Sequence, residues 1–480
     1  MKRRAVFAVA IVALLVPFVA ALPTSATART DRAAAKPPGS FKLIAHRSLM
    51  NRGMNAAIAM YRHYVYIGSR TDGGAHPNAG VFVFNVKDPA HPHRTEVIGP
   101  PNEGNDGETS RELRVWPEKQ LLIIMNLASN CSPEIHECGP SSQVKDDVYR
   151  FYDISGKNAG HPKLLHEYIP SVDPHEMYLW DDPDTPGRAL MFQSTPGGNT
   201  QLLVTDISDA REGKFTELGT WNTVIPDQES DNRLHSLTVS NDGKLAYLAY
   251  LGGGFFIVDT SDFAEGKPKP EVGLVTPIQN RVHWGNPGAH SAIKLPRRHY
   301  VLTTDEVYGK FGGVLAEHGC PWGWVRIVDI KDPTQPKVVS DYKLPQNDPS
   351  YCDSVPEDQE NFSSYSSHNP TLTKHLAIVT WHSGGLQAID LTDPLHPTQA
   401  AEYMPEPLPA VVTEDPALSS GRDKVVMWSY PIIRNGLIYV TDIRNGFYIL
   451  KYHGPYEGEV ANTHFLEGNS NLGDSRLIAP

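Results

Sequence analysis

The chain has 480 residues, 40% of them hydrophobic and 20% charged, and 55 acidic against 43 basic side chains give a formal net charge of −12. This composition excludes a fully disordered chain, collagen and a coiled coil. The acidic balance argues against a general nucleic-acid binder, which needs a basic surface. The length allows about three ordinary domains or one large repeat architecture.

The N-terminus has the pattern of a secretory signal peptide. Basic residues at positions 2–4 precede an apolar run over 5–22, and the small residues at 26–28 offer a cleavage site. We therefore predict a signal peptide over residues 1–28, a flexible leader over 29–40, and a secreted protein that is extracellular or held at the cell envelope. An uncleaved membrane anchor is the alternative, although a proline interrupts the apolar run. No later segment is long and apolar enough to span a bilayer.

One phrase recurs along the body of the chain: an aromatic or β-branched strand that runs into an Asp/Pro turn. Its clearest copies are GVFVFNVKDPAHP at 80–92, GGFFIVDTSDFA at 253–264, WVRIVDIKDPTQP at 324–336 and GLQAIDLTDPLHP at 385–397. Weaker copies lie at 147–162, 201–210 and 446–455. Other apolar strands flank each copy, and helical periodicity is nearly absent.

Seven units of four short strands predict an all-β fold, a seven-bladed β-propeller over residues 41–455 with a C-terminal tail over 456–480. The last unit stops after its third strand, and an unmatched strand at 41–49 precedes the first. We expect that strand to complete the last blade and close the ring. The Asp and Pro of the repeated turn have a structural role in this interpretation.

The phrases IVDIKDPTQP, AIDLTDPLHP and FNVKDPAHP resemble those of the LVIVD-repeat family of propellers. The resemblance covers roughly residues 41–455 and implies the propeller fold. It implies little about activity, because propellers include both binding modules and enzymes.

The chain has four cysteines, and export would permit disulfides. Of the three possible pairings, we predict two local bridges, Cys131 with Cys138 and Cys320 with Cys352. A zinc site is the alternative, but the spacing is not CxxC. A bridge between Cys320 and Cys352 would join two loops at the fifth and sixth blades.

Aligning the first strands gives one equivalent position in each blade. The series is Asn55, Arg111, His175, His235, His290, His368 and Ser429. Four consecutive blades thus carry histidine, and the first strand of a propeller blade lies beside the central channel. We predict that His175, His235, His290 and His368 converge at one mouth of the channel and bind Fe or Cu rather than Zn. The alternative is that these imidazoles only bond the backbone between blades.

The layout, though not the sequence, is similar to that of two groups of propeller metalloenzymes. Seven-bladed carotenoid oxygenases hold iron with four channel histidines from four blades, and the copper-dependent methanethiol oxidases resembling selenium-binding proteins are the second group. Polar residues at the ends of second strands should share the histidine face: Ser69, Asp305, Glu306, Trp381, His382 and Asp442. Glu306 and His382 are the candidate catalytic residues, since they would orient the imidazoles or act on a substrate.

Strand alternation predicts that Glu176 points away from its neighbour His175. Arg111, in the same ring position, would bind an anion or pair with Glu108 or Glu112.

Two functions follow from these features. The first is a secreted metalloprotein, an oxidoreductase acting on a small molecule at the channel mouth. The alternative is a non-catalytic extracellular scaffold that recognises a protein or a glycan through its rim loops. A calcium-stabilised hydrolase with an acidic rim is a third interpretation. The chain has no Walker loop, GxSxG elbow, HExxH motif or dinucleotide fingerprint, which disfavours the familiar hydrolase and nucleotide-binding classes.

Overall fold

The computed structural model describes residues 37–70, 80–99, 109–127, 147–195, 200–225, 233–284, 288–308, 319–356, 362–415 and 417–463. The predicted signal peptide, most of the predicted leader, and Cys131 with Cys138 lie outside the described residues, as does the chain from residue 464. The signal peptide, the flexible leader and the bridge between Cys131 and Cys138 therefore stay predictions.

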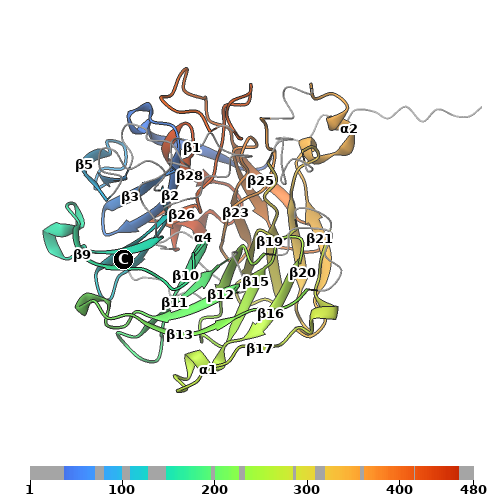
Figure 1. Ribbon diagram of the computed structural model, residues 1–480. Helices are drawn as coiled ribbons and strands as arrows, with labels where there is room; N and C mark the ends of the chain where they lie inside the picture. Colours follow the sequence, from blue (N-terminus) through green and yellow to red (C-terminus); the bar gives the residue numbers. More distant parts are fainter. Residues whose placement is uncertain are drawn as a thin grey trace, which may run out of the picture. The chain divides into compact units, whose positions relative to one another are not determined.

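Within the described residues the chain forms seven antiparallel sheets of four strands each, which confirms the all-β seven-bladed propeller (Figure 1). Blade 1 consists of β2 (Asn55–Tyr61), β3 (Tyr64–Ser69), β4 (Val81–Asn85) and β5 (His93–Ile98). Blade 2 consists of β6 (Thr109–Trp116), β7 (Leu121–Leu127), β8 (Val148–Asp153) and β9 (Lys163–Tyr168). Blade 3 consists of β10 (Glu176–Asp181), β11 (Ala189–Ser194), β12 (Leu202–Asp206) and β13 (Thr216–Trp221).

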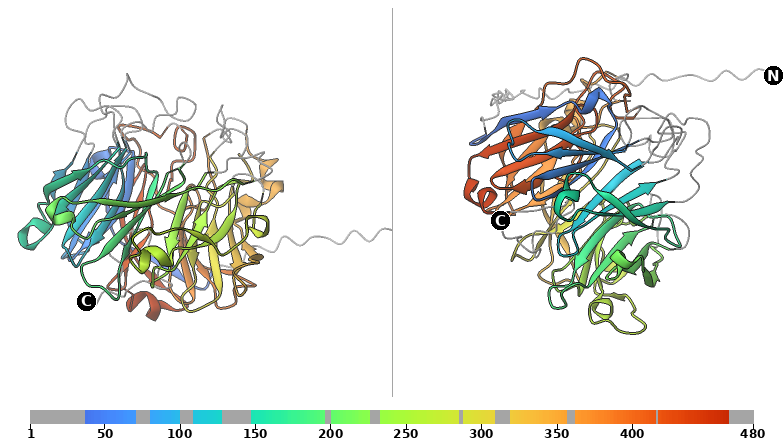
Figure 2. Two further views of the ribbon diagram at one scale, coloured as in Figure 1. Left: turned by 60° about the horizontal axis from the view of Figure 1, so that its bottom comes forward. Right: turned by 90° about the vertical axis from the view of Figure 1, so that its left-hand side faces the viewer.

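The next three blades repeat the same order of strands. Blade 4 consists of β14 (Ser236–Val239), β15 (Leu245–Ala249), β16 (Phe255–Asp259) and β17 (Gly273–Leu274). Blade 5 consists of β18 (Ser291–Lys294), β19 (Tyr300–Thr304), β20 (Val325–Asp329) and β21 (Lys337–Tyr342). Blade 6 consists of β22 (Pro370–Leu372), β23 (Leu376–Thr380), β24 (Leu386–Asp390) and β25 (Thr398–Tyr403). In Figure 2 the colours pass from one blade to the next in chain order.

Blade 7 combines strands from both ends of the described chain. It consists of β26 (Ile432–Arg434), β27 (Leu437–Asp442), β28 (Gly446–His453) and β1 (Ser40–Arg47). Strand β1 runs antiparallel to β28, with Ser40 opposite His453 and Arg47 opposite Phe447, and forms the outer edge of this sheet (Figure 1).

Helices are few and short in the described part of the chain. They are α1 (Ser261–Ala264), α2 (Pro349–Cys352) and α4 (Glu457–Ala461), with 3-10 turns η1 (Leu49–Asn51), η2 (Gly156–Ala159), η3 (Ala210–Glu212), η4 (Ile278–Asn280) and η5 (Pro345–Asn347). None of the helices among the described residues has the length and apolar character needed to cross a membrane.

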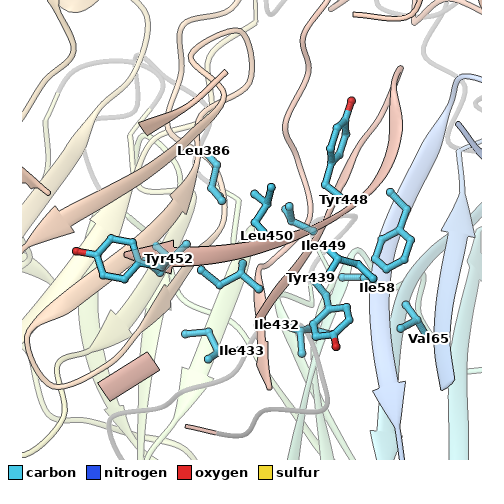
Figure 3. Packing of buried hydrophobic residues seen from close by; sticks show 14 of the residues in the cluster. Ile58, Val65, Leu386, Ile432, Ile433, Tyr439, Tyr448, Ile449, Leu450 and Tyr452 are labelled. Carbon is cyan, nitrogen blue, oxygen red and sulfur yellow. The ribbon is translucent and has the colours of Figure 1, made fainter. Parts of the chain in front are cut away.

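The hydrophobic core lies between the blades. Strands β2 and β7 are buried along their whole length, whereas the outer strands β5, β9 and β21 are mostly exposed or half-buried. One cluster joins blades 6, 7 and 1 through Leu386, Ile432, Tyr439, Leu450 and Ile58, all buried (Figure 3). Because each such side chain contributes about 1.5–3 kcal/mol on burial, every blade depends on its neighbours for stability.

The repeated Asp/Pro phrase forms a pair of side-chain turns. At the end of the third strand, an Asp or Asn oxygen accepts the N–H two residues further on, which ends the strand. The acceptors are Asn85, Asp153, Asp206, Asp259, Asp329 and Asp390. In the three copies that contain Asp-Pro, the Asp of that pair does the same, as Asp332 does for the N–H of Thr334. The repeated carboxylates therefore act in chain reversal.

Candidate metal centre

The four aligned histidines occupy one equivalent position in blades 3 to 6, immediately before or within two residues of the first strand. Each donates its backbone N–H to the last residue of the second strand of its own blade. The pairs are His175 with Ser194 (2.7 Å), His235 with Ala249 (2.9 Å), His290 with Thr304 (2.7 Å) and His368 with Thr380 (2.9 Å). The repeated register places four imidazoles at the same height in four neighbouring blades.

Hydroxyl groups connect these positions between blades. Ser194 Oγ donates to the His235 carbonyl at 2.6 Å, and Thr304 Oγ1 donates to the His368 carbonyl at 2.6 Å. Ser236 Oγ makes the same contact with the carbonyl of His290. The bond between blades is therefore accepted by the backbone carbonyl of His235, His290 and His368, and not by their imidazoles. Among the described residues, one of the four imidazoles does bond to the backbone of another segment: the His368 ring contacts the Trp428 carbonyl.

The side chains converge. Ring centroids lie 4.4 Å apart for His175 and His235, 4.0 Å for His235 and His290, and 4.4 Å for His290 and His368. The four rings thus form a curved row, the histidine arc, and His382 continues it with its ring centroid 4.9 Å from that of His368. His290 and His382 are fully buried, whereas His175 is only partly buried. The structure thus brings the four sequence-aligned histidines together and adds a fifth imidazole.

Glu306 reaches three of these rings. Its Oε2 lies 3.3 Å from His290 Nε2, and its Oε1 lies 3.1 Å from His368 Nε2 and 3.5 Å from His382 Nε2. Glu306 and His382 each lie two residues beyond the second strand of their blade, so the same position in neighbouring blades supplies both. Asp305 instead contacts Arg326 and accepts from Trp284 Nε1, as expected when successive side chains point to opposite sides.

A serine-rich segment just before His368 holds Glu306 in place. Ser366 Oγ accepts from the Val307 N–H at 2.9 Å and donates to the Asp305 carbonyl at 2.8 Å. Ser364 Oγ donates to the Val307 carbonyl. The backbone on both sides of Glu306 is therefore bonded to another loop, which restricts the carboxylate.

Hydrogen bonds fix which ring nitrogen of two histidines carries the proton. His368 Nδ1 lies 2.7 Å from the Trp428 carbonyl, which can only accept. His382 Nδ1 lies 2.9 Å from Ser364 Oγ, whose single proton is already donated to the Val307 carbonyl. Both imidazoles therefore carry the proton on Nδ1, and both Nε2 atoms present lone pairs.

These two lone pairs face a carboxylate oxygen, and the contact is repulsive unless a proton or a metal ion lies between the atoms. Burial disfavours the proton on His368, because it lowers the pKa of that ring to about 4. Nε2 of His290, His368 and His382, together with Oε1 of Glu306, are buried and have no well-directed hydrogen bond. Buried polar atoms without a partner are costly, and imidazole nitrogen with carboxylate oxygen is a common donor set for metals. The residues fit a metal ion.

The protonation states agree with that fit. Burial lowers the pKa of His175 and His235 well below the usual range, and lowers the pKa of His368 to about 4. Burial alone would raise the pKa of Glu306, but attraction to His368 and His290 in their positively charged form outweighs it and lowers that pKa well below its usual range, and a bound cation would act in the same direction. The rings of His175, His235 and His368 are therefore neutral near pH 7, which is the form that binds metal ions.

Two overlapping groups could hold an ion, each with ligand atoms within 4.8 Å of one another: His290, Glu306 and His368, or Glu176, His235 and His290. The second group corrects the expectation for Glu176. Its Oε1 lies 3.7 Å from His235 Nδ1, so its side chain reaches the histidine arc. His175 lies outside β10 whereas Glu176 is paired with Ser194 in its ladder, so strand alternation does not relate the two side chains. Burial raises the pKa of Glu176 well above its usual range.

His175 differs from the other three histidines because a cation lies next to it. Arg111 Nη2 is 3.4 Å from His175 Nε2, which in turn lies 2.9 Å from His235 Nε2. The guanidinium competes for the His175 lone pair and repels any positive ion there. The geometry of the described residues therefore favours His290, Glu306 and His368 over His175.

The remaining sequence candidates have other contacts. Ser69 Oγ accepts from the Gly80 N–H at 3.1 Å, and the Asp442 carboxylate accepts three backbone N–H groups of nearby turns. Cys320 and Cys352 form a disulfide, with sulfur atoms 1.98 Å apart. It joins a loop within blade 5 to the connection between blades 5 and 6.

Comparison with known proteins identifies a repeat. Residues 235–265 match the family model described as LVIVD repeat. The chain carries an LVIVD repeat. The LVIVD match begins at His235 and covers the first three strands of blade 4, so one histidine of the arc lies at its start. No protein of curated function matches the chain.

Solved structures similar to this chain are propellers of low identity. The periplasmic gluconolactonase PpgL of Pseudomonas aeruginosa is 13% identical, with 83% of this chain and 96% of that chain covered and a TM-score of 0.48. The C-terminal WD40 domain of Sif2 is 10% identical (86% and 99% covered, TM-score 0.49), and Sqt1 of Chaetomium thermophilum is 11% identical (87% and 100% covered, TM-score 0.49). Similarity at this level assigns no activity.

Three further residues contribute to the site without having been proposed for it from sequence. Trp428 places its ring 4.9 Å from His368 and accepts the Nδ1 proton through its carbonyl. Tyr308 lies 6.4 Å from His382, ring to ring, and burial raises its pKa. Ser364 belongs to the run SSYSSH that ends at His368. This serine-rich run is the sequence feature from which Ser364 could have been proposed.

Proposed function

We propose that this protein is a metal-dependent oxidoreductase whose metal ion is held by His290, Glu306 and His368, with His382 beside them. One observation carries the proposal: lone pairs on His368 Nε2 and His382 Nε2 face the same oxygen of Glu306 at 3.1 and 3.5 Å. A bound cation removes that repulsion and partners the buried atoms.

Iron is the metal that the donor set favours. Two histidines and one carboxylate with open positions are typical of non-haem Fe(II) oxygenases, whereas the four-histidine set expected from sequence left Fe and Cu equal. When bound, iron of this kind supplies redox chemistry with O₂. Ser364, Ser366 and the Trp428 carbonyl fix the donor atoms through hydrogen bonds. The burial of His290, His368 and His382 keeps bulk water away from them. The substrate in this proposal is a small molecule that enters the channel mouth.

The proposal includes an extracytoplasmic location and a ring closed by β1. The signal-peptide pattern over residues 1–28 supports export, and the disulfide between Cys320 and Cys352 suits an oxidising compartment. The pairing of β1 with β28 supports closure by the N-terminal strand.

Elemental analysis tests the metal. We expect protein from cultures supplied with Fe, Cu and Zn to retain about one iron per chain, and the His368→Ala variant to lose it, because removing a ligand weakens metal affinity strongly. His396→Ala is the matched control, since His396 is exposed and bonds only Asp393 among the described residues. Metal-free wild-type protein would refute the centre and favour the non-catalytic scaffold. Equal iron in both variants would show that His368 is not a ligand.

A further inference from the structure

Arg111 occupies a β-bulge next to the histidine arc. In β6 Ser110 pairs with Asn126 and Glu112 pairs with Met125, so Arg111 has no opposite residue in the ladder. A bulge of this kind changes the direction of a side chain and often lies near an active site. Here it lets the guanidinium contact His175.

Two guanidinium groups near Arg111 are neutralised by carboxylates. Arg114 pairs with Glu112 at 2.9 Å, and Arg70 pairs with Asp415 at 3.5 Å, all four side chains being buried. Arg111 has no carboxylate within ion-pair distance among the residues that the structure describes, and its Nε is buried without a hydrogen-bond partner. Its pairing with Glu112, one alternative from the sequence, is therefore wrong, while Glu108 lies outside the described residues.

A single indole lies against both Arg111 and the ligand group. The Trp428 ring centroid is 6.0 Å from the Arg111 guanidinium carbon and 4.9 Å from the ring centroid of His368. The unpaired cation and the proposed metal ligands thus contact the same side chain. An acidic molecule that lies along the Trp428 ring would therefore reach both His368 and Arg111.

We infer that Arg111 binds the anionic group of the substrate, a small carboxylate or comparable oxyanion. The inference rests on the proposed function and specifies its substrate class. A guanidinium presents paired N–H donors that match the two oxygens of a carboxylate, and a charge-assisted pair is strongest where water is excluded. The metal charge adds to the same preference for an anion.

Calorimetric titration of metal-loaded protein with acetate, and with its neutral isostere acetamide, tests the inference. We expect wild-type protein to bind acetate more tightly than acetamide, and Arg111→Gln to weaken acetate binding about tenfold, the effect of losing one charge-assisted contact. Arg111→Lys should restore part of the acetate affinity, and acetamide affinity should stay the same throughout. Arg150→Gln is the control, since Arg150 pairs with Glu167 between β8 and β9.

The outcomes separate this inference from the proposed function. Loss of the preference for acetate in folded Arg111→Gln protein with full metal content supports the inference. If the protein never holds a metal but binds acetate in a way that depends on Arg111, the inference is still supported and only the metal proposal fails. Equal acetate affinity in Arg111→Gln and wild type, or equal affinity of the wild type for acetate and acetamide, would overturn it. Thermal unfolding of each variant checks that the fold is intact.

Discussion

His368 and Glu306 face each other through two hydrogen-bond acceptors, Nε2 and Oε1, 3.1 Å apart. The proton of the imidazole is on the opposite nitrogen, which donates to the Trp428 carbonyl at 2.7 Å. The long-range fold holds both groups in place, because Glu306 follows the second strand of blade 5 and His368 precedes the first strand of blade 6. A cation between them accounts for the pair, and the following predictions depend on that relationship or on the scaffold around it.

The hydroxyl of Ser364 should matter for metal affinity although it cannot itself reach the ion. It accepts the Nδ1 proton of His382 at 2.9 Å, which turns the Nε2 lone pair toward Glu306. We expect Ser364→Ala to lower metal affinity about 10–100-fold, the usual effect of losing a group that orients a ligand. Ser354→Ala is the control, because that exposed hydroxyl donates to the Tyr351 carbonyl. Equal metal affinity of both variants, measured by competition with a chelator, would contradict the role given to Ser364.

Acid should lower the free energy of unfolding by protonating Asp153, the carboxylate of the repeated turn in blade 2. Burial alone would raise the pKa of Asp153, but bonds from Ser155, Asn158 and Arg211 outweigh it and lower the pKa to about 2 from 3.8. Because the folded-state pKa is below the unfolded one, this carboxylate stabilises the fold above pH 3.8, and the effect is lost as pH falls toward 2.

We therefore expect Asp153→Ala to cost about 1–2 kcal/mol of unfolding free energy at pH 7, a value reduced for partial exposure, with the cost shrinking below pH 4. Urea unfolding of both proteins between pH 3 and pH 7 measures it. A difference that stays constant over this range would show that the charge of Asp153 is not the cause.

Removal of β1 should expose the edge of blade 7. A chain that begins at residue 49 lacks the partner of β28, and an unpaired edge strand invites association between copies. We expect a lower thermal midpoint and aggregation, in contrast to a chain that begins at residue 37 and keeps β1. Light scattering recorded during heating gives the thermal midpoint and the extent of aggregation. Equal behaviour of the two truncated chains would argue against ring closure by the N-terminal strand.

The repeat made the fold and much of the site predictable from sequence. Each Asp/Pro phrase closes its own turn through contacts two residues apart, so local sequence determines it. The histidines were found because the same register recurs in four blades, and Glu306 and His382 because both follow a second strand. That these residues bind a metal remains a proposal.

Other features depended on contacts between distant segments. The bulge that turns Arg111 toward His175 has no mark in the sequence, and neither does the contact of Glu176 with His235. The proton positions on His368 and His382 are set by Trp428 and Ser364, which lie in other loops. Such pairings arise only when the blades are assembled, so a single sequence does not reveal them.

Anaerobic titration of metal-free protein with Fe(II), followed by calorimetry, tests the central claim most directly. We predict saturable binding of about one ion per chain to the wild type, and a loss of at least about tenfold in affinity for Glu306→Gln, whose amide keeps the shape but removes the charge. Glu459→Gln, altered at a carboxylate of α4 that accepts hydrogen bonds from His375 and Thr373, should bind like the wild type. Absence of saturable binding by the wild type, or equal binding by Glu306→Gln, would contradict a metal centre at Glu306.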